Sequence, residues 1–345
     1  MGIGATILMI VLFPLNSVLL AHEIVGNQSH VQAEVDREEN SIQGIVKGIE
    51  NKKKEERPKP KAQAVDDPIF QPVRKEGVKD LAVPGAHASV VIDADSGTIL
   101  HYDEGRTKRQ VASLTKLMTA VLVVEKIKDL KEIVTVDEEA VYVEGTKIGC
   151  PRSGYCVSQR LRVGEKISAE NLLQAMLMNS ANDAAVALSK HVSGSQEEFV
   201  EMMNKKAKDL GLKDTSFCTA SGLEIEGHES ECYSTAYDIA RIAAYSMRHD
   251  VIWEMLRTPS NLQILSADGK LVHTIINTDL ALDKVPNLIG GKTGFTPLAG
   301  YSLLMAASDP MEKKHRIVAV VLDDRTRWQD IKLMIDWAFS SYVWK

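Results

Sequence analysis

The spacing of hydrophobic and polar positions predicts strands near both ends of the folded region and helices between them. Residues 89–104, SVVIDADSGTILHYDE, contain two β-rich runs joined at Asp95–Gly97, a pattern that predicts a β-hairpin. From about Leu114 the apolar positions are dense enough to indicate a helix buried on most of its surface. Apolar residues recur at helical spacing in four later segments, residues 169–191, 195–212, 233–249 and 327–344.

The region before the last of these helices is predicted to form strands. Three apolar runs broken by turns lie around residues 290–295, 300–308 and 315–324. Between residues 134 and 167 the pattern is short and interrupted, which fits small strands or loops. A strand pair at the start, a helical middle and strands near the end indicate an α+β domain whose sheet joins both ends of the chain.

The N-terminal part of the chain differs from the rest. The run from Ile3 to Ala21 has no charged residue and is long enough to span a bilayer, so residues 1–21 are either a signal peptide or an N-terminal membrane anchor. Residues 22–83 are rich in charge and contain Pro and Gln with few apolar residues, which predicts a disordered linker. We therefore expect an exported protein whose folded domain covers residues 84–345.

Composition and charge narrow the range of partners. Of the 345 residues, 44% are hydrophobic and 26% charged, which is ordinary for a globular protein. The formal net charge is −6 and the isoelectric point is near 5.9. Nucleic-acid-binding proteins normally carry a clustered basic face, so we expect no nucleic-acid partner.

Four cysteines occur in two local pairs along the sequence. Cys150 and Cys156 lie in the stretch GCPRSGYC, and Cys218 and Cys232 flank a stretch rich in Gly, Glu and His. Four cysteines permit three pairings, and in an exported protein an even count favours two local disulfides. A zinc site is the alternative, but neither Cys-x-x-Cys spacing nor a paired His motif accompanies these residues, and we predict no metal.

Ser113 and Lys116 form the first of three short motifs that can carry chemistry. They stand at the start of the predicted apolar helix, where residues i and i+3 share a face, so Lys116 can reach the Ser113 hydroxyl. A serine hydroxyl becomes a nucleophile when a base removes its proton, and burial lowers the pKa of a lysine amine toward that role. Taken alone, the same pattern also fits an N-cap serine followed by a surface lysine.

The other two motifs are Ser180–Asn182, at the break within residues 169–191, and Lys292–Gly294, in a predicted strand. A hydroxyl and a carboxamide at a helix junction can project into a cleft, although Ser and Asn also favour turns and caps. In the strand, Lys292 and Gly294 lie on one face with Thr293 opposite. The lysine supplies a positive charge, and the glycine lets a substrate chain approach the strand edge closely.

The three motifs occur in the order found in penicillin-binding proteins and class A β-lactamases, S-x-x-K, S-D-N and K-T-G. From about Val90 onward, the chain resembles the D-alanyl-D-alanine carboxypeptidase family, the low-molecular-mass penicillin-binding proteins. Ala181, where β-lactamases carry Asp, favours a peptidase. The resemblance extends to the segments VASLTKLMTA, MLMNSANDAAVALS, LGLKDTSF, YSTAYDIARIA and GGKTGFTPLAGYSLLMAA.

This resemblance implies a β-lactamase/transpeptidase-like α+β fold, with a five-stranded antiparallel sheet packed with helices and an all-helical lobe, and the site between them. By resemblance, Ser113 attacks the carbonyl between two D-alanines and Lys116 is its general base. Ser180, helped by Lys292, relays the proton to the leaving amine. No metal or organic cofactor is implied. The residues expected to bind the substrate are Asn182, Thr293, Gly294, Phe295 (through its backbone N–H in the oxyanion hole, with that of Ser113), Thr296 and Arg325.

The resemblance also implies an activity and a location. We expect a serine-type D-alanyl-D-alanine carboxypeptidase that removes the terminal D-Ala from peptidoglycan stem peptides and is acylated by β-lactam antibiotics. The alternatives are a D,D-endopeptidase that cuts peptidoglycan cross-links and a non-catalytic protein that binds stem peptides or penicillin. The expected location is the periplasmic or extracellular face of the cytoplasmic membrane, with membrane contact only through residues 3–21.

Overall fold

The computed structural model describes the chain from residue 70 to residue 345, apart from residues 151–154, 260, 283 and 286. The predicted signal peptide or anchor, residues 1–21, and most of the predicted linker lie outside the described residues. In the part of the chain that is described, no helix is both long and apolar enough to cross a membrane.

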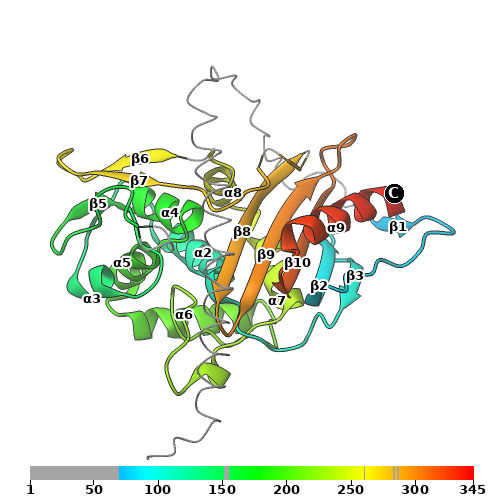
Figure 1. Cartoon of the computed structure of the whole chain (residues 1–345), viewed down its shortest axis with the longest axis horizontal. Coiled ribbons are helices and arrows are strands. Elements are labelled where there is room, and N and C mark those ends of the chain that lie inside the picture. The colour runs from blue at the N-terminus through cyan, green and yellow to red at the C-terminus, as the bar shows by residue number, and fades with distance from the viewer. Residues whose placement is uncertain (1–69, 151–154, 260, 283, 286) are drawn as a thin grey trace, which may run out of the picture. The chain divides into compact units, whose positions relative to one another are not determined.

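A five-stranded antiparallel sheet forms the centre of the fold, as the sequence predicts (Figure 1). The strand order is β3-β2-β10-β9-β8, so the predicted N-terminal hairpin lies at one edge and β8 lies at the other. The central pairing of β2 with β10 joins the two ends of the domain. The five strands are β2 (Ala86–Asp93), β3 (Ile99–Asp103), β8 (Leu288–Thr296), β9 (Gly300–Ser308) and β10 (Arg316–Asp324).

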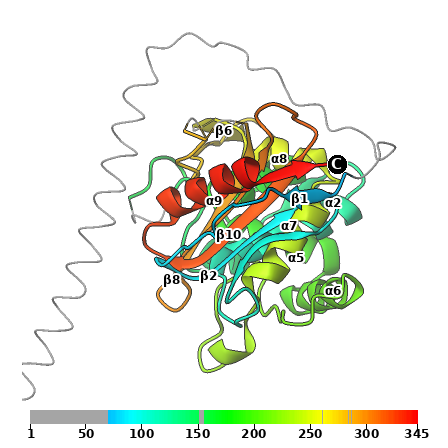
Figure 2. The same cartoon turned by 90° about the vertical axis from the view of Figure 1, so that its right-hand side faces the viewer.

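Both faces of the sheet are buried, because successive side chains of a strand point to opposite faces. In β10, Val318 and Val320 pack in the apolar core shared with the helical lobe. Ile317 and Ala319 pack in a second core under helix α9 (Arg327–Ser341). Figure 2 shows α9 on one side of the sheet and helices α5, α6 and α7 on the other.

The helices between β3 and β8 build the all-helical lobe that the resemblance implies. Hydroxyl caps start three of them, since Ser168, Ser195 and Thr235 each accept a hydrogen bond from a backbone N–H in the first turn. The lobe is organised around α2, which is buried from residue 116 to residue 123. Its helices are α2 (Lys116–Lys126), α4 (Ala169–Met178), α5 (Asn182–Ser193), α6 (Gln196–Asp209), α7 (Ala236–Ser246) and α8 (Asp250–Leu256).

The folded region begins earlier than the predicted boundary at residue 84. Strand β1 (Pro72–Arg74) pairs antiparallel with β11 (Tyr342–Trp344) at the other end of the chain. Val83 is also buried, in the core beneath α9. The predicted linker, residues 22–83, therefore extends too far toward the C-terminus, since its last part belongs to the folded domain. A three-residue strand at the end of a charged stretch shows no hydrophobic pattern in the sequence.

Several short elements fill the remaining connections. The interrupted region 134–167 contains the small strand pair expected there, β4 with β5, and also a helix, α3, that the pattern did not predict. The hairpin of β6 and β7 and helix α8 were not predicted either. The short elements are η1 (Ala112–Thr115), η2 (Glu229–Glu231), α3 (Glu138–Tyr142), β4 (Ile133–Thr135), β5 (Lys166–Ser168), β6 (Leu262–Leu265) and β7 (Val272–Ile275).

Candidate active site

Ser113 and Lys116 lie at the point where the short helix η1 passes into α2. Lys116 is the first residue of α2, and its Nζ atom lies 2.8 Å from Oγ of Ser113. Ala112, immediately before the serine, has a φ of +46°, in the left-handed region that residues with a Cβ rarely adopt. Such backbone strain persists only where surrounding structure enforces it, and it is concentrated at functional sites.

Two glycines allow that surrounding structure to close on η1. A Cβ atom on Gly222 would lie 2.0 Å from the carbonyl oxygen of Ala112, and one on Gly294 would lie 2.9 Å from that of Val111. A side chain at either position would therefore push η1 away. The loop that contains Gly222 and the strand that contains Gly294 consequently hold Ser113 between them.

Lys116 is completely buried and its amine has three close neighbours. Besides Ser113, Nζ contacts Oδ1 of Asn182 at 2.7 Å and the carbonyl oxygen of Ser221 at 2.6 Å. Burial lowers the pKa of Lys116 well below its usual value, and the positive charge of Lys292 lowers it further. Asn182 belongs to a sequence motif, whereas Ser221 contributes a backbone oxygen, which any residue type could supply and no residue pattern reveals.

Ser180 and Asn182 lie at the junction between α4 and α5, as the pattern predicts. Ser180 has a φ of +57°, a second left-handed residue at a motif position. Its Oγ accepts a hydrogen bond from Nζ of Lys292 at 2.8 Å. Asn182 was expected to hold the substrate, but here its carboxamide links Lys116 to the carbonyl oxygen of Glu144, to which Nδ2 donates at 2.8 Å.

Lys292 lies on β8, the edge strand of the sheet, and is buried against the helical lobe. Burial lowers the pKa of Lys292 to about 7, while the carboxyl of Asp279 acts in the opposite direction. Lys292 and Gly294 are both buried and Thr293 is half-buried, in line with the predicted strand alternation, and Thr296 is buried as well. Two buried lysines with lowered pKa values thus lie close enough to interact electrostatically, one on α2 and the other on β8.

The other substrate-binding candidates differ in where their side chains lie. Oγ1 of Thr296 donates a hydrogen bond to Oε1 of Glu224, which sequence reasoning missed. Oγ1 of Thr293 lies 2.8 Å from Oγ1 of Thr278. Arg325 is exposed beyond the end of β10, and none of its contacts links it to the other predicted site residues in the described part of the chain.

Phe295, expected to supply a backbone N–H to the oxyanion hole, lies on β8 next to Gly294. The ring packs against Tyr301 of β9, with ring centroids 4.5 Å apart. Phe295 and Tyr301 are also partners in the β8–β9 register. This pairing fixes the strand immediately after the Lys292–Gly294 motif.

The cysteines form the disulfides Cys150–Cys156 and Cys218–Cys232. The stretch before Cys150 packs directly on the second motif, since the backbone N–H of Asn182 donates to the carbonyl oxygen of Thr146 at 2.7 Å. The cysteine-bearing segment therefore supports Asn182.

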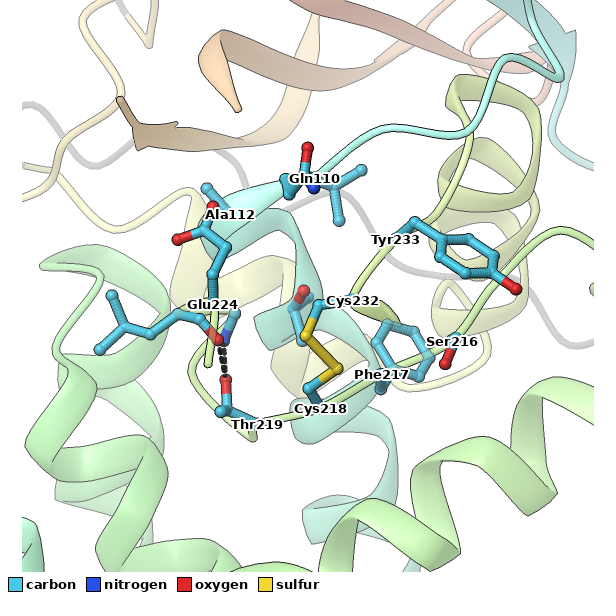
Figure 3. Close-up of a pocket in the computed structure, with 13 residues that line it drawn as sticks. Gln110, Ala112, Ser216, Phe217, Cys218, Thr219, Glu224, Cys232 and Tyr233 are labelled. Atoms are coloured by element: carbon cyan, nitrogen blue, oxygen red, sulfur yellow. Dashed lines mark hydrogen bonds between the residues drawn. A yellow bond between two sulfur atoms is a disulfide. The ribbon is translucent and has the colours of Figure 1, made fainter. Parts of the chain in front are cut away.

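The second disulfide closes the loop that carries Ser221, Gly222 and Glu224. Figure 3 shows the sulfur–sulfur bond in the wall of a pocket, between the strand-like segment of Phe217 and the neighbouring Gln110 and Ala112. Ala112 and Thr115 of η1 also line this pocket. Among the described residues, no cluster of His, Cys, Asp and Glu could hold a metal ion.

All three motifs lie within a stretch of the chain that matches a known protein family. The model of the D-alanyl-D-alanine carboxypeptidase family matches residues 78–326. This chain belongs to that family. The match covers the whole arrangement of Ser113, Lys116, Ser180 and Lys292 described above.

Individual relatives and solved structures give the same result. The chain is 35% identical over 265 residues to the D-alanyl-D-alanine carboxypeptidase DacF of Bacillus subtilis, covering 74% of this chain and 63% of that protein. It is 28% identical to a D-alanyl-D-alanine endopeptidase of Pseudomonas aeruginosa, covering 74% of this chain and 78% of that protein. A D-alanyl-D-alanine carboxypeptidase structure from Mycobacterium tuberculosis superimposes with a TM-score of 0.67 at 28% identity, covering 78% of this chain and 96% of that one. The transpeptidase-like fold is therefore confirmed, while the chain spans less than two thirds of the length of the Bacillus relative.

Proposed function

We propose that the protein is a serine D,D-carboxypeptidase that removes the terminal D-alanine from peptidoglycan stem peptides through an acyl-enzyme on Ser113. The observation that carries the proposal is the set of atoms around Nζ of Lys116. A neutral amine has two N–H donors and one lone pair. The Asn182 Oδ1 and Ser221 carbonyl oxygens only accept hydrogen bonds, so the lone pair is left for the hydroxyl of Ser113.

Acylation follows from this arrangement. Lys116 takes the Ser113 proton as Oγ bonds to the carbonyl carbon between the two D-alanines. The backbone N–H groups of Ser113 and Phe295 stabilise the resulting oxyanion. The C–N bond then breaks, and the leaving amine receives a proton through the hydroxyl of Ser180, which is hydrogen-bonded to Lys292. Water hydrolyses the ester and regenerates Ser113.

Substrate binding relies on charge and on the edge of β8. The cationic form of Lys292 attracts the terminal carboxylate of the stem, and the hydroxyls of Thr293 and Thr296 hydrogen-bond to it. Arg325 is the more distant candidate for the same carboxylate. Gly294 lets the stem peptide lie close to the strand, and Asn182 contributes mainly by orienting Lys116.

Mass spectrometry tests the activity directly. Purified full-length protein incubated with a stem pentapeptide is expected to release one D-alanine and leave a tetrapeptide. Ser113→Ala is expected to release none. Release at the same rate by wild type and Ser113→Ala would contradict the proposed nucleophile.

A D,D-endopeptidase that cuts cross-links is the second candidate. It is supported by the Pseudomonas aeruginosa endopeptidase, of which this chain covers 78%, compared with 63% of the Bacillus carboxypeptidase. The same mass-spectrometric assay with a cross-linked muropeptide dimer separates the two activities. Faster conversion of the dimer than of the pentapeptide would favour the endopeptidase.

The protein is further proposed to act outside the cytoplasm and to react covalently with β-lactams. Two disulfides close loops next to the site, and disulfides persist in oxidising compartments. The apolar run of residues 3–21 supplies an export signal or an anchor. N-terminal sequencing of the protein from membrane and soluble fractions distinguishes an uncleaved anchor from a cleaved signal peptide.

A further inference from the structure

The short segment Ile276–Asp279, between β7 and β8, lies beside both the second and the third motif. None of its residues belongs to those motifs. Asn277 and Asp279 are nevertheless buried, at 5% and 6% exposure. Buried polar residues in a connection require an explanation, because burying an amide or a carboxyl costs free energy unless it has partners.

One side of the segment fixes the chain immediately before Ser180. The backbone N–H of Thr278 donates to the carbonyl oxygen of Met178, the last residue of α4, at 2.9 Å. The backbone N–H of Ile276 donates to Oδ1 of Asn179 at 3.3 Å. These two bonds hold the turn in which Ser180 adopts its left-handed conformation.

The other side of the segment contacts β8 on both sides of Lys292. Oγ1 of Thr278 lies 2.8 Å from Oγ1 of Thr293, the residue after the lysine. A Cβ atom on Gly291, the residue before it, would lie 2.6 Å from Oδ2 of Asp279. Thr278 thus contacts the residue two positions before Ser180 through its backbone and Thr293 of the third motif through its hydroxyl.

Asn277 anchors the segment to the rest of the lobe. Its Nδ2 donates to the carbonyl oxygens of Leu256, at the end of α8, and Thr258. Its Oδ1 accepts the backbone N–H of Asp279 at 2.9 Å. The backbone at Asp279 is therefore held in place by Asn277.

The Asp279 carboxyl is only partly satisfied by these contacts. Oδ1 accepts the backbone N–H of Ala281 at 2.8 Å, whereas Oδ2 has no hydrogen-bond partner among the described residues. An unpaired buried carboxylate oxygen is costly unless a nearby positive charge compensates it. Lys292 is the cation that acts on Asp279 electrostatically.

We propose that Thr278 and Asp279 are positioning residues for the Ser180–Lys292 pair. Thr278 links the end of α4, just before Ser180, to Thr293, and Asp279 places a buried, unpaired carboxylate oxygen beside Gly291, the residue before Lys292. The inference rests on the proposed function, in which Lys292 acts as a cation and Ser180 relays a proton. It adds a fourth element to the three motifs that the sequence shows. Neither residue touches the reacting atoms; each acts through Lys292, Ser180 or Thr293.

The charges around the lysine support the role of Asp279. Lys292 interacts electrostatically with Asp279 of the segment and with Lys116 of α2. Lys116 in turn interacts electrostatically with Asp183 of α5. Burial lowers the pKa of Lys292 to about 7, and Asp279 is the carboxyl that opposes this effect. The pKa of Asp279 is itself raised by burial, to about 6. Between the pKa of Asp279 and that of Lys292, the carboxyl and the amine are therefore both charged.

Acylation kinetics with a fluorescent penicillin, measured from about pH 5 to about pH 10 on the full-length protein, test the inference. In Asp279→Asn the pKa of Lys292 falls, so the loss of rate at high pH is expected to begin about one pH unit lower than in wild type. Thr278→Val is expected to slow acylation about tenfold, and Thr278→Ser, which keeps the hydroxyl, is expected to retain the wild-type rate.

Asp93→Asn is the matched control, since Asp93 is a buried, hydrogen-bonded carboxylate on β2, three strands away from β8. It is expected to keep the wild-type pH profile. An unchanged pH profile in Asp279→Asn, or equal rates in Thr278→Val and Thr278→Ser, would overturn the inference. If the melting curve shows that Asp279→Asn does not fold, the comparison of Thr278→Val with Thr278→Ser tests the inference by itself. These two variants alter no charged group.

Failure of the inference and failure of the proposed function give different results. If wild type and Asp93→Asn are not acylated at all, the proposed function fails. If both are acylated and the variants at 278 and 279 behave like them, only the positioning role fails.

Discussion

Nζ of Lys292 lies 2.8 Å from Oγ of Ser180, and this hydrogen bond joins the edge strand of the sheet to the junction of two helices. The two residues are 112 positions apart in the sequence. Their distance therefore depends on how the sheet packs against the helical lobe. A small shift between these two parts would separate the lysine from the Ser180 hydroxyl, whereas the contact of Lys116 with Ser113 is made within three residues of one segment.

The first prediction concerns the base. Replacing Lys116 by Ala removes the amine 2.8 Å from Oγ of Ser113, so acylation by a fluorescent penicillin is expected to slow by roughly 10²–10⁴-fold. The matched control is Lys332→Ala, which removes a half-exposed lysine of α9 paired with Asp336. Near-normal labelling of Lys116→Ala would mean that another group activates Ser113.

The second prediction concerns the pH dependence of acylation. In the proposed mechanism Lys116 acts as a neutral base, so the rate should rise as pH climbs through its lowered pKa. Lys292 acts as a cation in the same mechanism, so the rate should fall as pH climbs through the pKa of Lys292, which is about 7. The acylation rate is therefore expected to depend on pH as a bell-shaped curve, and its two apparent pKa values describe the coupled pair of lysines. A rate that keeps rising to high pH would exclude a role for the charge of Lys292.

The third prediction concerns Glu224, whose carboxylate accepts the hydrogen bond of the Thr296 hydroxyl. If Thr296 binds the carboxylate of the substrate, the negative charge of Glu224 repels that carboxylate. Glu224 also accepts the hydrogen bond that the Thr296 hydroxyl would otherwise donate to the substrate. Glu224→Gln is therefore expected to raise the acylation rate about fivefold by removing the repulsion. Glu226→Gln, an exposed neighbour on the same loop, should leave the rate unchanged. A lower rate in Glu224→Gln would show instead that the carboxylate is needed to orient Thr296.

The fourth prediction concerns the disulfide Cys218–Cys232, which closes the loop that supplies Ser221 and Glu224. The double variant Cys218→Ser/Cys232→Ser is expected to lower the free energy of unfolding by about 3 kcal/mol, because the loop gains freedom in the unfolded chain. Its acylation should also slow, since the Ser221 carbonyl no longer holds Lys116 firmly. Urea unfolding and penicillin labelling measure the two effects. An unchanged free energy of unfolding with slow acylation would mean that the disulfide orders the active-site loop without stabilising the fold.

Much of the fold and of the central site could be predicted from the sequence, for identifiable reasons. Periodicity marks the long helices and the sheet strands, because each buries a continuous apolar face. Ser180 and Asn182 were placed at a helix junction because their side chains favour turns and caps. The motif order then indicated which distant residues meet, and the structure brings Lys116 to Asn182 and Lys292 to Ser180.

The rest could not be predicted because it depends on tertiary contacts without a sequence pattern. Ser221 contributes a carbonyl oxygen, which any residue type could supply. Thr278 and Asp279 look like ordinary turn residues, and their spacing to Lys292 matches no motif. Glu224 stands among other acidic loop residues, and only its contact with Thr296 distinguishes it. The boundary at residue 84 was wrong because β1 gains its stability from β11 at the far end of the chain.

The central claim is that Ser113 forms an acyl-enzyme with D-alanyl-D-alanine substrates and their β-lactam mimics. The most direct measurement is the intact mass of the full-length protein after exposure to penicillin, followed by peptide mapping of the modified residue. We expect one adduct, on Ser113, which Ser113→Ala lacks, together with release of D-alanine from a stem pentapeptide by the wild type only. An unmodified wild-type protein, or an adduct that persists in Ser113→Ala, would contradict the role of Ser113 as the nucleophile.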